Sequence, residues 1–310
     1  MFDKQQRRVL KKKFKNFRKA GTDVFNHILS LGTTNKIIND KEIRVIGMKR
    51  TGNHAIINWI FSQLEETKCF LNYVAPSKNP FITFHKTGTA TEFPQEDFYK
   101  KFNIKAEQLG FFSKKKALIY SYEDDFLQDI YSKHFEKHHN RWVGKSKERH
   151  EILILRDPFN LFASRLKLEE LLDNVIPLRN DTGRDTVISL WKQYAKELLN
   201  ETNFINKNKI TVNYNSWVID VKYRQQLAEH LNLEFSDIKA KEVIPIGGGS
   251  SFDKDQTNAT NMKLFERWKH FQNDKYFREL FEDKELIELS DAIFGEIPEV
   301  KQWLNKNTLT

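Results

Sequence analysis

The chain has 310 residues, of which 39% are hydrophobic and 30% are charged, and it carries a formal net charge of +9. A chain of this length and composition can bury the core of one sizeable α/β domain, which excludes a disordered protein and a small disulfide-stapled one. The single cysteine, Cys69, excludes an internal disulfide and suits a reducing compartment.

The positive charge is concentrated in the first 20 residues, which contain nine Lys or Arg and one Asp and so account for +8 of the total. Leu10, Phe14 and Phe17 would share one face of a helix with basic residues around them. A basic amphipathic helix is typical of peripheral contact with an anionic or glycolipid-bearing membrane, and the alternative is a solvated tail. The near-neutral remainder gives no support for binding nucleic acid.

The sequence gives no sign of membrane insertion or secretion. No window approaches the roughly 18 consecutive apolar residues of a membrane span. The N-terminus also lacks the apolar core of a signal peptide. We therefore expect a cytoplasmic protein, peripheral to the inner membrane surface if its basic tail binds lipid.

The first motif is Ile43–Leu64, which reads as an apolar strand, a loop and an amphipathic helix. This is the layout of a phosphate-binding loop, and Gly47 and Gly52 satisfy its G-x-x-x-x-G spacing. Asn53 and His54 stand where a nucleotide-triphosphate loop has the Lys and Ser/Thr that bind phosphate and Mg²⁺. The motif favours an anion other than Mg-ATP, and a connection without any ligand is the alternative. The basic residues of the loop are Lys49 and Arg50.

Two polar inserts and one strand follow. Residues 75–116 contain several prolines and are expected to form an irregular insert, and residues 136–149 a basic one. Between them, Ala117–Tyr122 is a predicted strand that ends in three carboxylates. Glu123 is the first of these carboxylates and stands at the carboxyl end of the strand. The alternative is a carboxylate at a helix N-terminus, a description that fits Asp124 and Asp125 better.

The second motif is Glu151–Lys167. A continuous apolar run, typical of a strand buried on both faces, ends in Arg156. Asp157 is the predicted N-cap of the next helix, and Ser164 lies two turns into that helix. Arg156 thus stands where ligands bind in open α/β sheets, although a surface ion pair with Asp157 is the alternative.

Apolar strands alternating with helices predict an α/β fold with a P-loop-type parallel sheet of about five strands, flanked by helices on both faces. We divide the chain into a basic N-terminal tail or helix, residues 1–40, and a single α/β domain, residues 41–310. The predicted strands are Arg44–Gly47, Cys69–Val74, Ala117–Tyr122, Ile152–Leu155 and Ile210–Asn213. The predicted helices are Ala55–Glu66, Phe159–Leu172, Thr186–Asn200, Tyr223–Leu231, Asn261–Phe271 and Lys284–Phe294.

The two motifs together resemble the sulfotransferase family, whose donor is 3′-phosphoadenosine 5′-phosphosulfate (PAPS). The resemblance covers roughly residues 43–295. It implies that the loop holds the 5′-phosphosulfate, and that the Arg of Arg-Asp-Pro and the Ser eight residues later hold the 3′-phosphate. Weaker likenesses are Tyr214, near the adenine, and a C-terminal loop over the nucleotide. The residues that the resemblance implies for the donor are Arg50, Thr51, Gly52, Asn53, His54, Ala55, Arg156, Ser164, Tyr214, Ser250, Ser251 and Arg267.

Sulfuryl transfer needs cations at the leaving phosphate and a base for the acceptor. Arg50 is the first candidate for the leaving phosphate because its planar fork suits phosphate oxygens, and Lys49 is the alternate. The resemblance places the base at the end of the strand that precedes Arg-Asp-Pro, which selects Glu123. His85 is the runner-up for this role.

The sequence therefore predicts a PAPS-dependent sulfotransferase acting on a hydroxyl or amine of a carbohydrate or glycolipid. The rival enzyme is a small-molecule kinase with a degenerate loop, and a non-catalytic polyanion-binding protein is a third hypothesis. No metal is expected: His134 and His138 are four residues apart, as zinc ligands can be, but the Glu between them is at the wrong position for H-E-x-x-H and no third ligand is evident. The sequence names no acceptor.

Overall fold

The computed structural model describes residues 36–64, 67–85, 102–171, 176–242, 252 and 262–307. The basic segment 1–20 and the pair Ser250 and Ser251 lie outside the described residues. The described chain contains one five-stranded sheet in the order β2-β3-β1-β4-β5, and every neighbouring pair is parallel. The predicted parallel sheet of about five strands is confirmed. The strands are β1 (Ile37–Gly47), β2 (Lys68–Leu71), β3 (Lys115–Glu123), β4 (Lys145–Leu155) and β5 (Lys209–Asn213).

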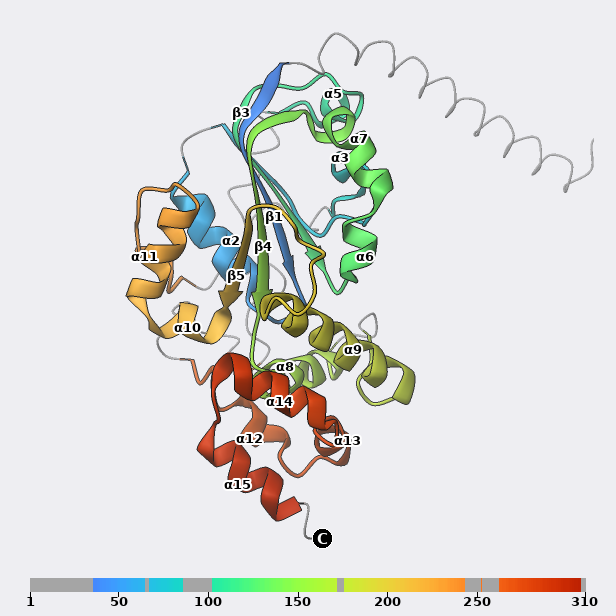
Figure 1. The fold of residues 1–310 in the computed structure, drawn as a ribbon, viewed down its shortest axis with the longest axis vertical. Helices are drawn as coiled ribbons and strands as arrows, with labels where there is room; N and C mark the ends of the chain where they lie inside the picture. The colour runs from blue at the N-terminus through green and yellow to red at the C-terminus, as the bar shows by residue number, and fades with distance from the viewer. Residues whose placement is uncertain are drawn as a thin grey trace, which may run out of the picture.

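Helices cover both faces of the sheet, as predicted (Figure 1). One face carries α2 (Asn53–Ser62), α10 (Tyr214–Ile219) and α11 (Val221–His230). The other face carries α3, α5, α6, α7, α8 and α9, with the C-terminal helices packed beyond α8 and α9. Their bounds are α3 (Pro80–Thr83), α5 (Ile104–Gln108), α6 (Leu127–Ile130), α7 (Lys133–Val143), α8 (Pro158–Glu169), α9 (Asp181–Leu198), α12 (Arg267–Phe271), α13 (Lys275–Glu279), α14 (Lys284–Phe294) and α15 (Pro298–Asn307).

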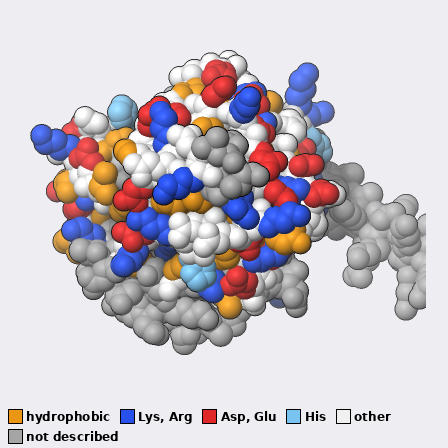
Figure 2. Space-filling model, turned by 90° about the horizontal axis from the view of Figure 1, so that it is seen from below, with side chains coloured by type: hydrophobic (Ala, Val, Ile, Leu, Met, Phe, Trp, Pro, Cys, Tyr) orange, Lys and Arg blue, Asp and Glu red, His pale blue; other side chains and the backbone are white. Residues whose placement is uncertain are grey.

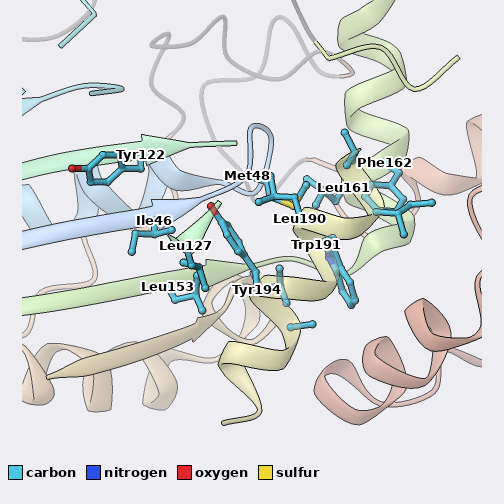
Figure 3. Close-up of a cluster of buried hydrophobic side chains, with 14 of the residues drawn as sticks. Ile46, Met48, Tyr122, Leu127, Leu153, Leu161, Phe162, Leu190, Trp191 and Tyr194 are labelled. Atoms are coloured by element: carbon cyan, nitrogen blue, oxygen red, sulfur yellow. The ribbon is translucent and has the colours of Figure 1, made fainter. Parts of the chain in front are cut away.

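The larger hydrophobic cluster fills the space between the sheet and α8 and α9 (Figure 3). Ile46 and Leu153 of the sheet, Leu161 of α8 and Trp191 of α9 all belong to this cluster, and all four are fully buried. Phe162 and Leu166 of α8 are fully buried as well, so the apolar side of this helix belongs to the core. This packing fixes α8, and with it Ser164, against the ends of the strands.

Strands β1 and β4 begin earlier than predicted, and the residues that extend them at the amino end include charged ones. Glu42 accepts a hydrogen bond from Tyr120 Oη at 2.7 Å, and Arg44 pairs with Glu151 at 3.3 Å and Glu136 at 3.1 Å. Because buried charges are stable when paired and hydrogen-bonded, these positions can lie inside the fold. Residues 136–149, expected as an insert, form most of α7 and the start of β4 instead. The first strand likewise begins before residue 41, where we placed the domain boundary.

Two other predictions need correction. The helix expected over 261–271 is confined to α12, since residues 262–266 form bends and turns and the helix begins only at Arg267. The strand expected over Cys69–Val74 ends at Leu71. Helix α14 has the predicted bounds, and the predicted core segments of α2, α8, α9 and α11 are helical.

The all-parallel order places the carboxyl ends of all five strands at one edge of the sheet, toward α8, α9 and α10 (Figure 1). Strand β1 lies at the centre, between β3 and β4. The chain leaves β1 toward one side of the sheet and later returns to its other side, so the loop after β1 lies at a topological switch point. Ligands bind at such points in open α/β sheets.

Candidate functional site

The loop between β1 and α2 is shaped to present backbone N–H groups. Arg50 has φ 73°, and Gly52, the N-cap of α2, has φ 99°. The Thr51 N–H donates to the Met48 carbonyl at 3.1 Å, which closes the turn. Helix α2 begins at Asn53, and the first N–H groups of a helix have no partner within it. They and the helix dipole point into the space above the loop, which is therefore suited to an anion.

Gly52 is required in this loop both because of its positive φ and because of a close contact. A Cβ at this position would lie 2.1 Å from Cε2 of Tyr214. Tyr214 is the first residue of α10, directly after β5, and its ring packs against the loop. The structure thus brings the predicted loop and the predicted adenine-side tyrosine into contact.

A second cationic site adjoins the loop. Arg156, at the end of β4, donates to the Ser164 hydroxyl at 3.4 Å, and Arg267 of α12 donates to the same hydroxyl at 3.0 Å. Asn160 orients this group, because its carbonyl accepts from Ser164 Oγ at 2.7 Å and its side chain accepts from the Arg267 N–H at 2.9 Å. Three residues that the sequence assigned to one nucleotide are therefore neighbours.

Arg156 is 1% exposed, and no carboxylate among the described residues pairs with it. Its other acceptors are the carbonyl oxygens of Arg50, at 3.3 Å, and Leu264, at 2.6 Å. Its Nε has no partner within the described part of the chain. The guanidinium also lies 5.3 Å from the centroid of the Tyr214 ring. A buried cation balanced only by neutral oxygens and a ring is prepared for an anionic ligand.

The charges around the loop reinforce this conclusion. Burial, together with the nearby guanidinium of Arg156, lowers the pKa of Arg50 to about 10, and Arg165 acts in the same direction. Tyr214 and Glu123 offset part of this effect. Guanidinium groups that destabilise one another in a partly buried space would be stabilised by the negative charges of a phosphate.

Glu123 ends β3 beside the loop, as predicted. Its Oε1 accepts from Asn53 Nδ2 at 3.4 Å and lies 3.8 Å from His54 Nε2. The His54 ring also contacts the side-chain oxygen of Asn72, beyond β2, at 3.0 Å. The side chains of Asn53 and His54 are therefore directed toward the ends of β2 and β3. Their backbone N–H groups lie in the first turn of α2, where a helix supplies no partner for them.

The other candidates occupy the same edge of the sheet. Lys49 holds its ammonium 4.8 Å from the centroid of the Tyr73 ring, just beyond β2. His85 is exposed and donates its backbone N–H to the Asn72 carbonyl at 2.8 Å. Ala55 continues the first turn of α2 through its bond to the Gly52 carbonyl at 3.1 Å. The structure thus places Glu123 nearer to the loop residues than it places His85.

Asp124 and Asp125 do not cap a helix, since the N-cap of α6 is Phe126. Asp124 accepts from the Lys49 N–H at 2.9 Å and from Arg165 at 2.7 Å. Asp125 has one carboxylate oxygen that is buried and has no partner among the described residues. Burial, and then the charges of Asp124 and Asp129, raise the pKa of Asp125 to about 7. Sequence reasoning missed Arg165, because nothing in its local pattern points to a carboxylate 41 residues away.

We expect Asp125→Asn to change the pH dependence of stability. A raised pKa means that the folded state retains a proton that the unfolded state has lost, so the free energy of unfolding falls as pH rises from about 4 to about 7. The free energy of unfolding of the variant should equal that of the wild type near pH 4. At pH 8 it should be higher than that of the wild type by on the order of 2 kcal/mol. Urea unfolding at both values measures this, with the exposed Glu288→Gln as the control. If the difference in free energy of unfolding between variant and wild type did not change with pH, the raised pKa of Asp125 would be wrong.

Two surveys of the described residues bear on the alternatives. No three His, Cys, Asp or Glu side chains within them gather as a metal site. None of the helices in the described part is long and apolar enough to cross a membrane. Figure 2, a view from the end where the C-terminal helices lie, shows basic and acidic side chains interspersed on the described surface. The described residues on that face form no patch of a single charge sign of the kind that binds a polyanion without specificity.

No protein-family model matches the sequence, and no curated protein matches it. Among solved structures, it is similar to the sulfotransferase domain from the curacin biosynthetic pathway, with 13% identity, a TM-score of 0.48, and coverage of 83% of this chain and 98% of that one. It is also similar to the mouse sulfotransferase SULT7A1 complexed with PAP, with 13% identity, a TM-score of 0.40, and coverage of 88% and 81%.

Proposed function

We propose that this protein is an enzyme that transfers the sulfuryl group of PAPS to a hydroxyl or amine of an acceptor, with a carbohydrate or glycolipid as the acceptor class. The observation that carries the proposal is the meeting of Arg156 and Arg267 at the hydroxyl of Ser164, directly beside an anion-binding loop. One cationic site would serve any phosphate ester. Two adjoining sites match a nucleotide with phosphate groups on both sides of its ribose.

The donor would be held at three places. The N–H groups at the start of α2, with Arg50, would hold the 5′-phosphosulfate. Arg156, Ser164 and Arg267 would hold the 3′-phosphate through charge-assisted hydrogen bonds. Tyr214, which packs on Gly52 and faces Arg156, would lie along the nucleoside between the two.

The chain's own residues supply the rest of the reaction. Glu123 would take the proton of the acceptor as its oxygen or nitrogen attacks sulfur. The bond between sulfur and the bridging phosphate oxygen breaks in line with the attack. Arg50, with Lys49 as the alternate, and the loop N–H groups would stabilise the negative charge that develops on the departing phosphate. These cations make a metal unnecessary for this step.

The kinase alternative is disfavoured by the same contacts. A triphosphate loop needs a Lys and a hydroxyl after its last Gly. In this chain the Asn53 side chain donates hydrogen bonds to the Met48 carbonyl, at 3.2 Å, and to Glu123. The His54 ring is hydrogen-bonded to the side chain of Asn72. The third hypothesis, polyanion binding through the tail, concerns residues outside those described.

Calorimetry tests the proposal on the full chain, at about 0.3 M salt so that exposed basic residues are screened. We expect 3′,5′-diphosphoadenosine to bind at least tenfold more tightly than ATP-Mg²⁺, because only the bisphosphate occupies both cationic sites. Preference for ATP-Mg²⁺ would return the chain to the kinase hypothesis. Tight bisphosphate binding with no turnover of PAPS on any of a panel of glycans, glycolipids and amines would support a binding protein instead.

A further inference from the structure

A buried ion pair links the two sides of the candidate site. Arg165 Nη1 of α8 lies 2.7 Å from Asp124 Oδ1, just past the end of β3. The two side chains are 4% and 5% exposed. Burying two charges costs free energy, so a pair at this depth needs further hydrogen bonds to be held.

Those further bonds go to the backbone of the loop. Asp124 Oδ1 accepts from the Lys49 N–H at 2.9 Å, and Arg165 Nη1 donates to the Lys49 carbonyl at 3.4 Å. The Asp124 N–H donates to the carbonyl of Gly47, the last residue of β1, at 3.3 Å. The pair thus holds both polar groups of Lys49, the residue directly before Arg50.

The neighbours of the pair are the residues that the reaction would use. Arg165 directly follows Ser164, and Asp124 directly follows Glu123. Asp124 has φ 62°, a left-handed conformation that costs free energy in residues other than glycine, although Asp adopts it more readily than most. A strained residue persists when the surrounding contacts hold it, and here those contacts lead to the loop and to α8.

We propose that Asp124 and Arg165 form a positioning clamp that sets the spacing between the loop and the Arg156–Ser164–Arg267 site, so that one nucleotide occupies both. This inference rests on the proposed function. A ligand with two anchored ends gains affinity from its second end only when the spacing of the sites matches its own. Small displacements of a binding group lose a large part of that gain. Neither residue needs to touch the nucleotide for this role.

Three variants separate the parts of the clamp. Asp124→Asn keeps an oxygen for the Lys49 N–H and removes the charge, whereas Asp124→Ala removes both. Arg165→Lys keeps the charge but replaces the guanidinium, whose Nη1 donates to both Asp124 and the Lys49 carbonyl, with a shorter ammonium side chain. For each variant, calorimetry measures the affinities for 3′,5′-diphosphoadenosine, adenosine 3′-phosphate and adenosine 5′-phosphate.

We expect Asp124→Ala to weaken bisphosphate binding by about thirtyfold and to weaken each monophosphate by less than about threefold. The bisphosphate affinities of Asp124→Asn and Arg165→Lys should lie between those of Asp124→Ala and the wild type. Lys115→Met is the matched control, because the ion pair of Lys115 with Glu107 is also buried and lies at the other end of β3. It should lower the thermal midpoint and leave the ratio of bisphosphate to monophosphate affinity unchanged.

The possible outcomes decide between the two proposals. If the wild type prefers the bisphosphate but all three nucleotides weaken equally in Asp124→Ala, or none weakens, the clamp is wrong and the proposed function stands. The clamp is also wrong if Lys115→Met changes the affinity ratio as much as Asp124→Ala does. If the wild type binds the bisphosphate no better than either monophosphate, the proposed function fails and the clamp fails with it.

Discussion

Arg156→Ala is expected to weaken the binding of 3′,5′-diphosphoadenosine by about a hundredfold and that of adenosine 5′-phosphate by less than about threefold. Charge-assisted hydrogen bonds from a guanidinium to phosphate are worth about 1.5–3 kcal/mol each, and two of them account for a change of this size. In the proposed complex the 5′-phosphate is bound by the loop between β1 and α2, so the affinity for adenosine 5′-phosphate should change little. Calorimetric titration of both nucleotides against the variant measures the difference.

The variant also loses donors to the Arg50 and Leu264 carbonyls, so we expect its free energy of unfolding to fall by on the order of 2 kcal/mol. Arg224→Ala controls for this loss, because Arg224 is 2% exposed and also donates to backbone carbonyls, those of Trp217 and Val218. The control should be destabilised without any change in nucleotide preference. Equal weakening of both nucleotides in Arg156→Ala would remove the 3′-phosphate assignment.

Glu123→Gln is expected to lower the kcat for sulfuryl transfer by about 10²- to 10⁴-fold, the usual contribution of a positioned base. Nucleotide affinity should stay within about twofold, because the amide keeps an oxygen for Asn53 and contacts no phosphate in the proposed complex. The measurement is the release of 3′,5′-diphosphoadenosine from PAPS in the presence of an active acceptor, with calorimetry of the product alongside.

Asp125→Asn and His85→Ala are the matched variants for this experiment. Asp125 is the neighbouring carboxylate whose pKa is about 7, and His85 is the alternative base at the same edge of the sheet. Both variants should retain most of the activity. Wild-type turnover in Glu123→Gln, with a large loss in one of the other two, would assign the base to that residue instead.

For β1 and β4, sequence reasoning located the carboxyl ends of the strands and missed their amino halves. The ends beside the site carry apolar runs such as Ile152–Leu155, which indicate a buried strand. The amino half of β1 contains Asn39, Glu42 and Arg44, which are buried because α7 and the neighbouring strands bond to them. Hydropathy cannot reveal polar residues that become buried through partners distant in sequence.

The same limit applies to the site. Arg156 and Ser164 could be paired because their eight-residue spacing resembles a known family motif, and the structure joins them at 3.4 Å. The contact of Arg165 with Asp124 and that of His54 with Asn72 join segments from different strands and helices. Such pairs depend on the order of the strands in the sheet, which no local pattern specifies.

The strand order also has a consequence for how the chain is made. Strand β1 leaves the ribosome first among the strands of the sheet, but its neighbours are β3 and β4, and β2 pairs with β3. No pair of these strands can form until β3, Lys115–Glu123, has emerged. The segment Ile43–Ile46, which is apolar except for Arg44, therefore remains unpaired while some seventy further residues are synthesised. At cellular rates this takes about four to fourteen seconds. During that interval the nascent chain exposes a strand prone to aggregation, and we expect it to depend on chaperones before it can fold.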